Sequence, residues 1–277
     1  MQKHTTGTRP MQINDMTALK NMEGESIFLE SDNFLIHMLN TSPYKPKDKD
    51  LNDPLWKKGS HPLLMGLVER AQNELRYKCA PHPSHNDKLR TCSHEAAHAT
   101  VMGADGCSIK EVLAWADFQG WAGVVLHNPP FHMPSQSTNP DLWLMRKAVY
   151  LLSGYAGEIF SGYEHPMSAL TERVSAMGIC LFLDEKFGKE QGYLYRRAMS
   201  YCQTVLEANR EAFDAIFAEL IHEGRVTGKQ AKRILKKPSA RAQLSLEVFT
   251  MESGLLQHNN EWPRTSQKTQ FSLTQEI

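Results

Sequence analysis

Long apolar runs are the first thing that this 277-residue sequence lacks. No stretch approaches the roughly 18 consecutive apolar residues that a membrane-spanning helix needs. The amino terminus also has no apolar segment behind its positive charges, which a secretory signal would require. We therefore expect a cytoplasmic protein without a membrane span.

Paired cysteines and net charge are missing as well. The five cysteines are scattered and odd in number, and none belongs to a Cys-x-x-Cys pair. This pattern favours reduced thiols over a disulfide framework, and it gives a thiolate zinc site no support. Lysine and arginine together number 31, as do aspartate and glutamate. Such a balance provides no field to attract nucleic acid, so the basic cluster at 229–237 reads as a solvated helix face.

The spacing of apolar residues predicts a mainly α (α+β) fold with a small β-hairpin or sheet. Helices are expected over 62–77, 86–103, 139–160, 168–186, 190–223 and 227–236, and strands over 111–116 and 121–127. Residues 60–237 would form one domain, with an extension at 1–59 and a polar tail at 238–277. Prolines and charged residues from Thr41 to Pro54 predict a linker inside the extension.

The string His94-Glu95-Ala96-Ala97-His98 carries the chemistry. On a helix, positions i and i+4 face the same side, so both imidazoles can reach one zinc ion. Glu95 would then lie beside the metal, close enough to accept a proton from its water.

A catalytic zinc site needs a third protein ligand, and periodicity alone does not select it. The downstream candidates are Glu158, Glu164, His165 and Glu172. His82 and His85 stand beside prolines in a polar segment and are read as solvated. Cys92 is read as a small buried apolar group and not as a nucleophile.

These segments resemble the FtsH-type zinc metallopeptidases, which are the protease domains of membrane-bound ATP-dependent proteases. The family's zinc helix reads HEAGHA, and Ser93 to Ala99 here reads SHEAAHA. The family's helix GGRAAEE is similar to SGYAGEIFSG at Ser153 to Gly162, which places Glu158 on a family glutamate. The resemblance covers residues 90–237, including the C-terminal helices, and implies a zincin-like helical peptidase domain.

The resemblance also implies a third ligand. The family has an aspartate in a segment like GASNDLxxAT, and SALTERVSAM at Ser168 to Met177 is similar to it. This alignment puts Glu172 at the aspartate position, which is a departure in residue type. Shifting the alignment by one residue would put Thr171 there and remove the ligand, and His165 stays an alternative.

The resemblance implies a zinc-dependent endopeptidase that acts on unfolded or exposed protein segments. No G-x-x-x-x-G-K-[ST] loop is present, so we expect no ATP hydrolysis. His94, His98 and Glu172 would hold zinc, Glu95 would be the general base, and Glu158 would orient a ligand histidine or form a structural ion pair. The strand around Val124 is either an ordinary core strand or a partner for an extended peptide.

Two other functions fit the same residues. One is a catalytically inactive binding or regulatory protein, since glutamate replaces the family's aspartate. The other is a regulatory protease with a single cytoplasmic target. The related proteases form hexameric rings, which makes a homo-oligomer a further option.

Overall fold

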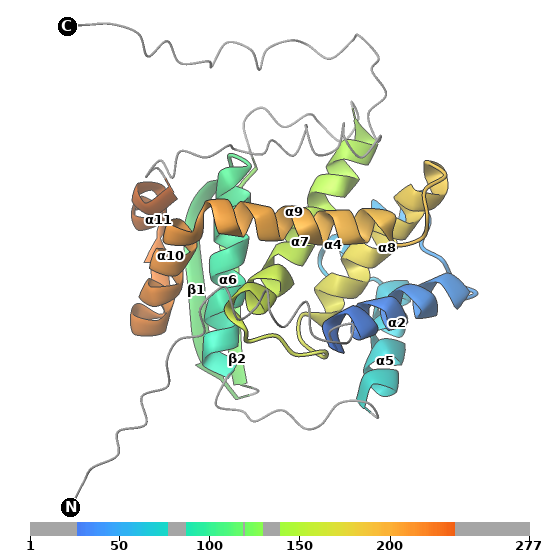
Figure 1. The fold of residues 1–277 in the computed structure, drawn as a ribbon, viewed down its shortest axis with the longest axis horizontal. Coiled ribbons are helices and arrows are strands. Elements are labelled where there is room, and N and C mark those ends of the chain that lie inside the picture. Colours follow the sequence, from blue (N-terminus) through green and yellow to red (C-terminus); the bar gives the residue numbers. More distant parts are fainter. Residues whose placement is uncertain (1–26, 77–86, 119, 130–138, 236–277) are drawn as a thin grey trace, which may run out of the picture.

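The computed structural model describes residues 27–76, 87–118, 120–129 and 139–235. Most of these residues are helical, and one small antiparallel sheet completes the fold (Figure 1). The mainly α prediction with a small sheet is confirmed at this level. No helix in these ranges is both long and apolar enough to cross a membrane.

Most of the predicted elements are present. The elements are α2 (Ile27–Thr41), α3 (Asp48–Leu51), α4 (Pro54–Lys57), α5 (Pro62–Arg76), α6 (Asp87–Ala104), β1 (Ser108–Asp117), β2 (Gly120–Asn128), α7 (Pro140–Ser161), α8 (Leu170–Lys186), α9 (Tyr193–Ala208), α10 (Arg210–Glu223), β3 (Arg225–Thr227) and α11 (Gly228–Leu235). Asn139 caps α7 as predicted, because its side chain accepts a hydrogen bond from the Leu142 amide.

The sheet has the strand order β2-β1-β3, with antiparallel pairing throughout. The predicted hairpin is confirmed, with Asp117 opposite Gly120 at its tip and an irregularity between Ile109 and Glu111. The three-residue strand β3 was not predicted. Within the described residues β2 pairs only with β1, so its other edge has no strand partner.

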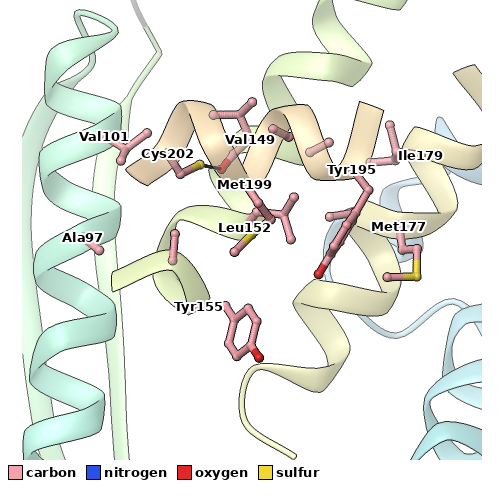
Figure 2. Close-up of a cluster of buried hydrophobic side chains, with 14 of the residues drawn as sticks. Ala97, Val101, Val149, Leu152, Tyr155, Met177, Ile179, Tyr195, Met199 and Cys202 are labelled. Atoms are coloured by element: carbon pink, nitrogen blue, oxygen red, sulfur yellow. Dashed lines mark hydrogen bonds between the residues drawn. The ribbon is translucent and has the colours of Figure 1, made fainter. Parts of the chain in front are cut away.

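Helix α7 lies at the centre of the hydrophobic core, where it packs against α6, α8 and α9 (Figure 2). Buried residues lie on most sides of α7, as its apolar residues on most sides predicted. The core cluster in Figure 2 includes Ala97 and Val101 of α6, Val149, Leu152 and Tyr155 of α7, Met177 and Ile179 of α8, and Tyr195, Met199 and Cys202 of α9. This packing fixes α6, which carries the histidine motif, relative to α7 and α8.

The single helix predicted over 190–223 is wrong, because the chain divides into α9 and α10 at Asn209. The backbone φ of Asn209 is −116°, and its side-chain amide donates to the Val205 carbonyl at 2.8 Å. An asparagine that bonds a nearby backbone carbonyl competes with the helical pattern. As a result α9 lies across α7 and α8, while α10 turns to pack on α6 and β3.

The linker predicted from Thr41 to Pro54 is also wrong. It contains α3, and α4 begins at its last residue, capped by Asp53, which accepts from the Leu55 amide at 2.7 Å. Leu51 and Trp56 are buried in the core, as are Leu35 and Leu39 of α2. The aspartates and prolines that suggested a linker act here at helix starts, so residues 27–57 belong to the same packed body.

Candidate metal centre

The two motif histidines lie on one face of α6, with their ring edges turned toward each other. Nε2 of His94 lies 2.9 Å from Nε2 of His98. The His98 side chain is buried, and the His94 ring is largely so. The helical spacing therefore brings two potential ligand nitrogens together, as the sequence predicted.

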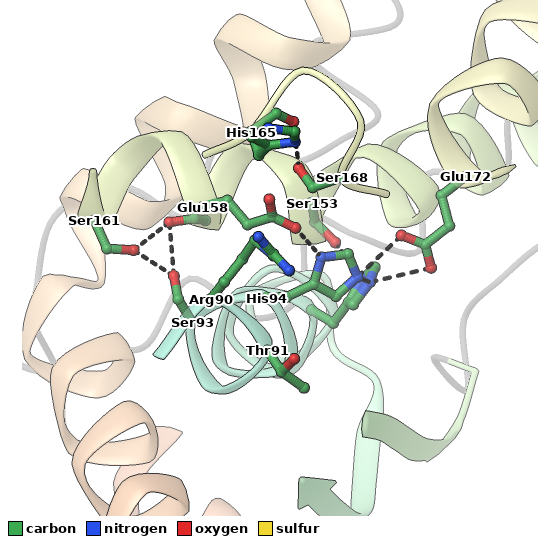
Figure 3. Close-up of polar contacts among 12 residues, drawn as sticks. Arg90, Thr91, Ser93, His94, Ser153, Glu158, Ser161, His165, Ser168 and Glu172 are labelled. Atoms are coloured by element: carbon green, nitrogen blue, oxygen red, sulfur yellow. Dashed lines mark hydrogen bonds and ion pairs between the residues drawn. The ribbon is translucent and has the colours of Figure 1, made fainter. Parts of the chain in front are cut away.

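The other nitrogen of each ring is held by α7, and this determines which nitrogen carries the proton. His94 Nδ1 donates to the Glu158 carboxylate at 2.8 Å (Figure 3). His98 Nδ1 lies 2.8 Å from Ser153 Oγ, whose own hydrogen goes to the Tyr150 carbonyl at 2.7 Å. Ser153 must then accept from His98. Both rings are protonated on Nδ1, which leaves the Nε2 lone pairs directed at the shared space.

Two lone pairs at 2.9 Å repel each other unless a positive charge lies between them. Without a metal, a proton takes that place. Burial lowers the pKa of His94, but Glu172 and Glu158 outweigh it and raise this pKa well above the ordinary value. A divalent metal ion satisfies both lone pairs at once. The donor geometry therefore fits a cation shared by the two imidazoles.

Glu172 completes the group from the first turn of α8 (Figure 3). Its Oε2 lies 3.0 Å from His94 Nε2, and its Oε1 lies 3.5 Å from His98 Nε2. Burial raises the pKa of this carboxyl, but the two facing imidazoles more than offset it and hold the pKa well below the usual range. His94, His98 and Glu172 have ligand atoms within 4.8 Å of one another and could hold a metal ion.

The remaining candidates for the third ligand occupy other positions. Glu158 contacts the far side of the His94 ring, as expected for an orienting residue. His165 lies in the loop before α8, where its Nδ1 accepts from the Met167 amide at 3.2 Å. Neither His165 nor Glu164 belongs to the metal-binding group found among the described residues. His82 and His85 lie outside the described residues.

Glu95 directly follows His94 on α6 and lines a cavity beside the ligand group. The cavity has a volume of about 540 Å³, and His98 and Glu172 also line it. The Glu95 side chain is buried, and this burial raises its pKa against the opposing effect of the two histidines. A carboxylate with a raised pKa binds a proton more readily, which suits a general base.

The walls of this cavity come from α7 and β2. Trp143, Tyr150 and Leu151 of α7 line it, together with Gly123, Val124 and Val125 of β2. Among the described residues β2 is an edge strand, and it borders the same space as Glu95 and the ligand group. Within the part of the chain that the structure describes, β2 pairs only with β1, and Val124 in this strand is half-buried.

Two glycines allow the close approach of these elements. A Cβ built on Gly154 of α7 would lie 2.3 Å from His94 Nε2 and 2.6 Å from His98 Nε2. A Cβ built on Gly123 of β2 would lie 2.4 Å from Glu95 Cγ. No real Cβ comes so close to another heavy atom, so both positions need glycine for the site to keep this geometry.

Ser153 and Gly123 are site residues that the sequence did not reveal. The run of small residues in SGYAG on α7 is the one signal that could have indicated close helix packing at this point. Cys92 is buried, and burial raises the pKa of its thiol to about 11, which agrees with the reading of a small apolar group. Lys229, Lys232 and Arg233 are exposed on α11.

No protein-family model matches the chain, and no curated protein matches its sequence.

Proposed function

We propose that this protein is a zinc-dependent endopeptidase that hydrolyses peptide bonds in unfolded or exposed protein segments without ATP. The observation that carries this proposal is the pair of Nε2 lone pairs on α6, with the Glu172 carboxylate facing both of them. Two imidazoles and one carboxylate are a ligand set that catalytic zinc sites use, with one position left open.

The residues of the site divide into ligands and supports. His94, His98 and Glu172 would hold the ion, while Glu158 and Ser153 fix the ring orientations through Nδ1. When bound, zinc lowers the pKa of water toward 7 and polarises a carbonyl oxygen.

Glu95 is assigned the proton transfers. Its carboxylate accepts a proton from the water that attacks the scissile carbonyl carbon. It then donates this proton to the amine nitrogen as the carbon–nitrogen bond breaks. The burial that raises its pKa favours the first step, because a carboxylate with a raised pKa accepts a proton more readily.

The edge of β2 that has no strand partner among the described residues would supply a place for the substrate backbone. An extended peptide can add to an unpaired strand edge through main-chain hydrogen bonds, and β2 borders the cavity at Gly123 to Val125. A side chain of this peptide would enter the cavity against Trp143 and Leu151, which favours an apolar residue. Only an extended segment fits such an edge, so folded domains would be poor substrates.

The test compares the wild type with Glu95→Gln. Amide and carboxylate have the same shape, so the substitution removes the base while the three ligands stay in place. We expect cleavage of an unfolded protein such as reduced casein to fall by about 10²- to 10⁴-fold. Zinc content, measured by elemental analysis, should stay at one ion per chain.

Three outcomes would contradict the proposal in different ways. A wild-type chain that binds no zinc removes the metal centre. A wild-type chain that binds zinc but cleaves no unfolded protein favours the inactive binding protein instead. Equal cleavage by both forms would show that Glu95 is not the base. Cleavage of a single protein in a cytoplasmic extract would identify the regulatory protease.

A further inference from the structure

A buried arginine follows the third ligand directly in the chain. Arg173 is fully buried, and its guanidinium lies over the Tyr155 ring at 4.0 Å. One of its nitrogens forms an ion pair with Asp32 of α2 and a 3.0 Å hydrogen bond to Ser31. Tyr195 of α9 donates to the same Asp32 oxygen at 3.0 Å. Arg173 thus joins α2, α7, α8 and α9.

The same guanidinium also holds the loop that leads into α8. Arg173 Nη1 donates to the Pro166 carbonyl at 2.6 Å. The loop then enters α8 through Ala169, which has a φ of 48° and is the one described non-glycine residue with a positive φ. A non-glycine residue keeps this conformation only where its surroundings enforce it. The Asp32–Arg173 pair thus lies where the first turn of α8 is fixed.

Glu172 belongs to that first turn and directly precedes Arg173 in the chain. We propose that α2, through Asp32 and Arg173, positions the Glu172 carboxylate against the two histidines. This inference rests on the proposed metal centre. It assigns a role in metal binding to a helix that lies far from the histidine motif in sequence.

The energetics of buried ion pairs agree with a positioning role. A buried pair adds little net stability over apolar side chains of similar volume, because both charges lose their hydration. Besides stability, a buried ion pair can contribute a fixed position of the elements that carry its two charges. An error of 1 Å in the position of a site group costs about 10²-fold in function. A role in positioning Glu172 would explain why the Asp32–Arg173 ion pair lies at the start of α8.

The experiment measures zinc affinity in the full chain with Asp32→Asn. The amide keeps the shape of Asp32 and removes its charge. We expect zinc affinity, from competition with a fluorescent chelator, to fall about tenfold, at the low end for groups behind a metal ligand. The visible absorption of bound cobalt(II) should weaken, since a displaced Glu172 lets water replace it. Arg173→Lys keeps the positive charge but removes the two-nitrogen guanidinium group. This variant should show a smaller loss of zinc affinity than Asp32→Asn.

Asp184→Asn is the matched control. Asp184 is a buried carboxylate at the other end of α8, where it accepts from the Gly192 and Leu194 amides. The Asp184→Asn substitution should lower thermal stability about as much as Asp32→Asn does. It should leave zinc affinity and the absorption spectrum of bound cobalt(II) unchanged. Asp32→Asn with wild-type zinc affinity would overturn the inference. Equal losses of affinity in both variants would overturn it too.

A double-mutant cycle with Glu172→Ala separates positioning from other effects. If Asp32 acts through Glu172, Asp32→Asn should weaken zinc binding no further once Glu172 is gone. Additive losses would show that Asp32 acts by another route and would contradict the inference. A wild-type chain without zinc affinity would reject the metal centre itself, which is a separate result.

Discussion

At the scale of single residues, the site depends on which nitrogen of each histidine carries the proton. Glu158 and Ser153 settle this by occupying Nδ1 of His94 and His98. Neither residue touches the shared space directly, yet both determine that two lone pairs meet there. The candidate metal centre therefore includes a second set of residues, which lie on α7 and contact the ligand histidines.

Replacing Glu158 with glutamine tests whether this carboxylate holds the proton on His94 Nδ1. The amide can still accept from His94 Nδ1, but it lacks the charge that favours this proton. Zinc affinity should fall by about 10- to 100-fold, as is typical for partners of ligand histidines. Chelator competition measures the change, and unchanged affinity would show that Glu158 is only a structural residue.

Gly154→Ala tests the close approach of α7 to the rings. The added Cβ would lie 2.3 Å from His94 Nε2, so the histidines must move and zinc affinity should fall at least about tenfold. Gly66→Ala on α5 is the control, because a Cβ there meets nothing within 4 Å. That variant should gain about 0.5–1 kcal/mol of stability from helix propensity and keep its zinc affinity.

Sequence patterns predicted the residues of this site that lie on α6, but they did not select the ligand from α8. His94, Glu95 and His98 lie within one helix, so the 3.6-residue period is enough to place them together. Glu172 comes from another helix, and only the family resemblance selected it over His165. The orientation of α8 depends on packing with α2, α7 and α9, and periodicity carries no information about such long-range contacts.

At the scale of elements, β2 connects the sheet to the chemistry. Its outer edge is open among the described residues, and Gly123 brings its backbone against the Glu95 side chain. The two short apolar runs at 111–116 and 121–127 predicted the hairpin correctly, but they say nothing about which strand lies at an edge. The third strand has only three residues, which is too short for any periodicity.

Gly123→Ala is predicted to separate catalysis from metal binding. A Cβ at this position would lie 2.6 Å from Glu95 Oε1 and displace the carboxylate, and its three nearest atoms all belong to Glu95. The rate of peptide hydrolysis should fall by about 10²-fold, with zinc affinity unchanged. Peptidase assays and chelator competition on one preparation measure both. A variant that cleaves at the wild-type rate would remove β2 from the catalytic geometry.

At the scale of the whole molecule, residues 27–57 are part of the core. Composition failed here because charged and proline residues at helix starts resemble those of a linker. Three helices in this segment, of which α3 and α4 have only four residues each, bury leucines and Trp56, and α2 packs on α5 and α8. The boundaries of a functional domain therefore extend beyond the stretch with recognisable motifs.

Leu51→Ala measures this integration. Leu51 is fully buried, so its loss should lower the free energy of unfolding by about 2–5 kcal/mol in urea denaturation. Leu55, four residues on and 45% exposed, is the control, and Leu55→Ala should change stability by no more than about 0.5 kcal/mol. Equal small effects would mean that α3 does not contribute to the core.

Among the described residues the outer edge of β2 has no strand partner, and this bears on how a peptide would lie in the proposed site. A strand edge pairs with an incoming chain in a parallel or an antiparallel direction, and the two directions form different hydrogen-bond patterns. The direction of the bound chain would therefore decide which of its peptide bonds lies beside Glu95. A peptide with the reversed sequence is then expected to be cut at a different bond, which mass spectrometry of the products would detect.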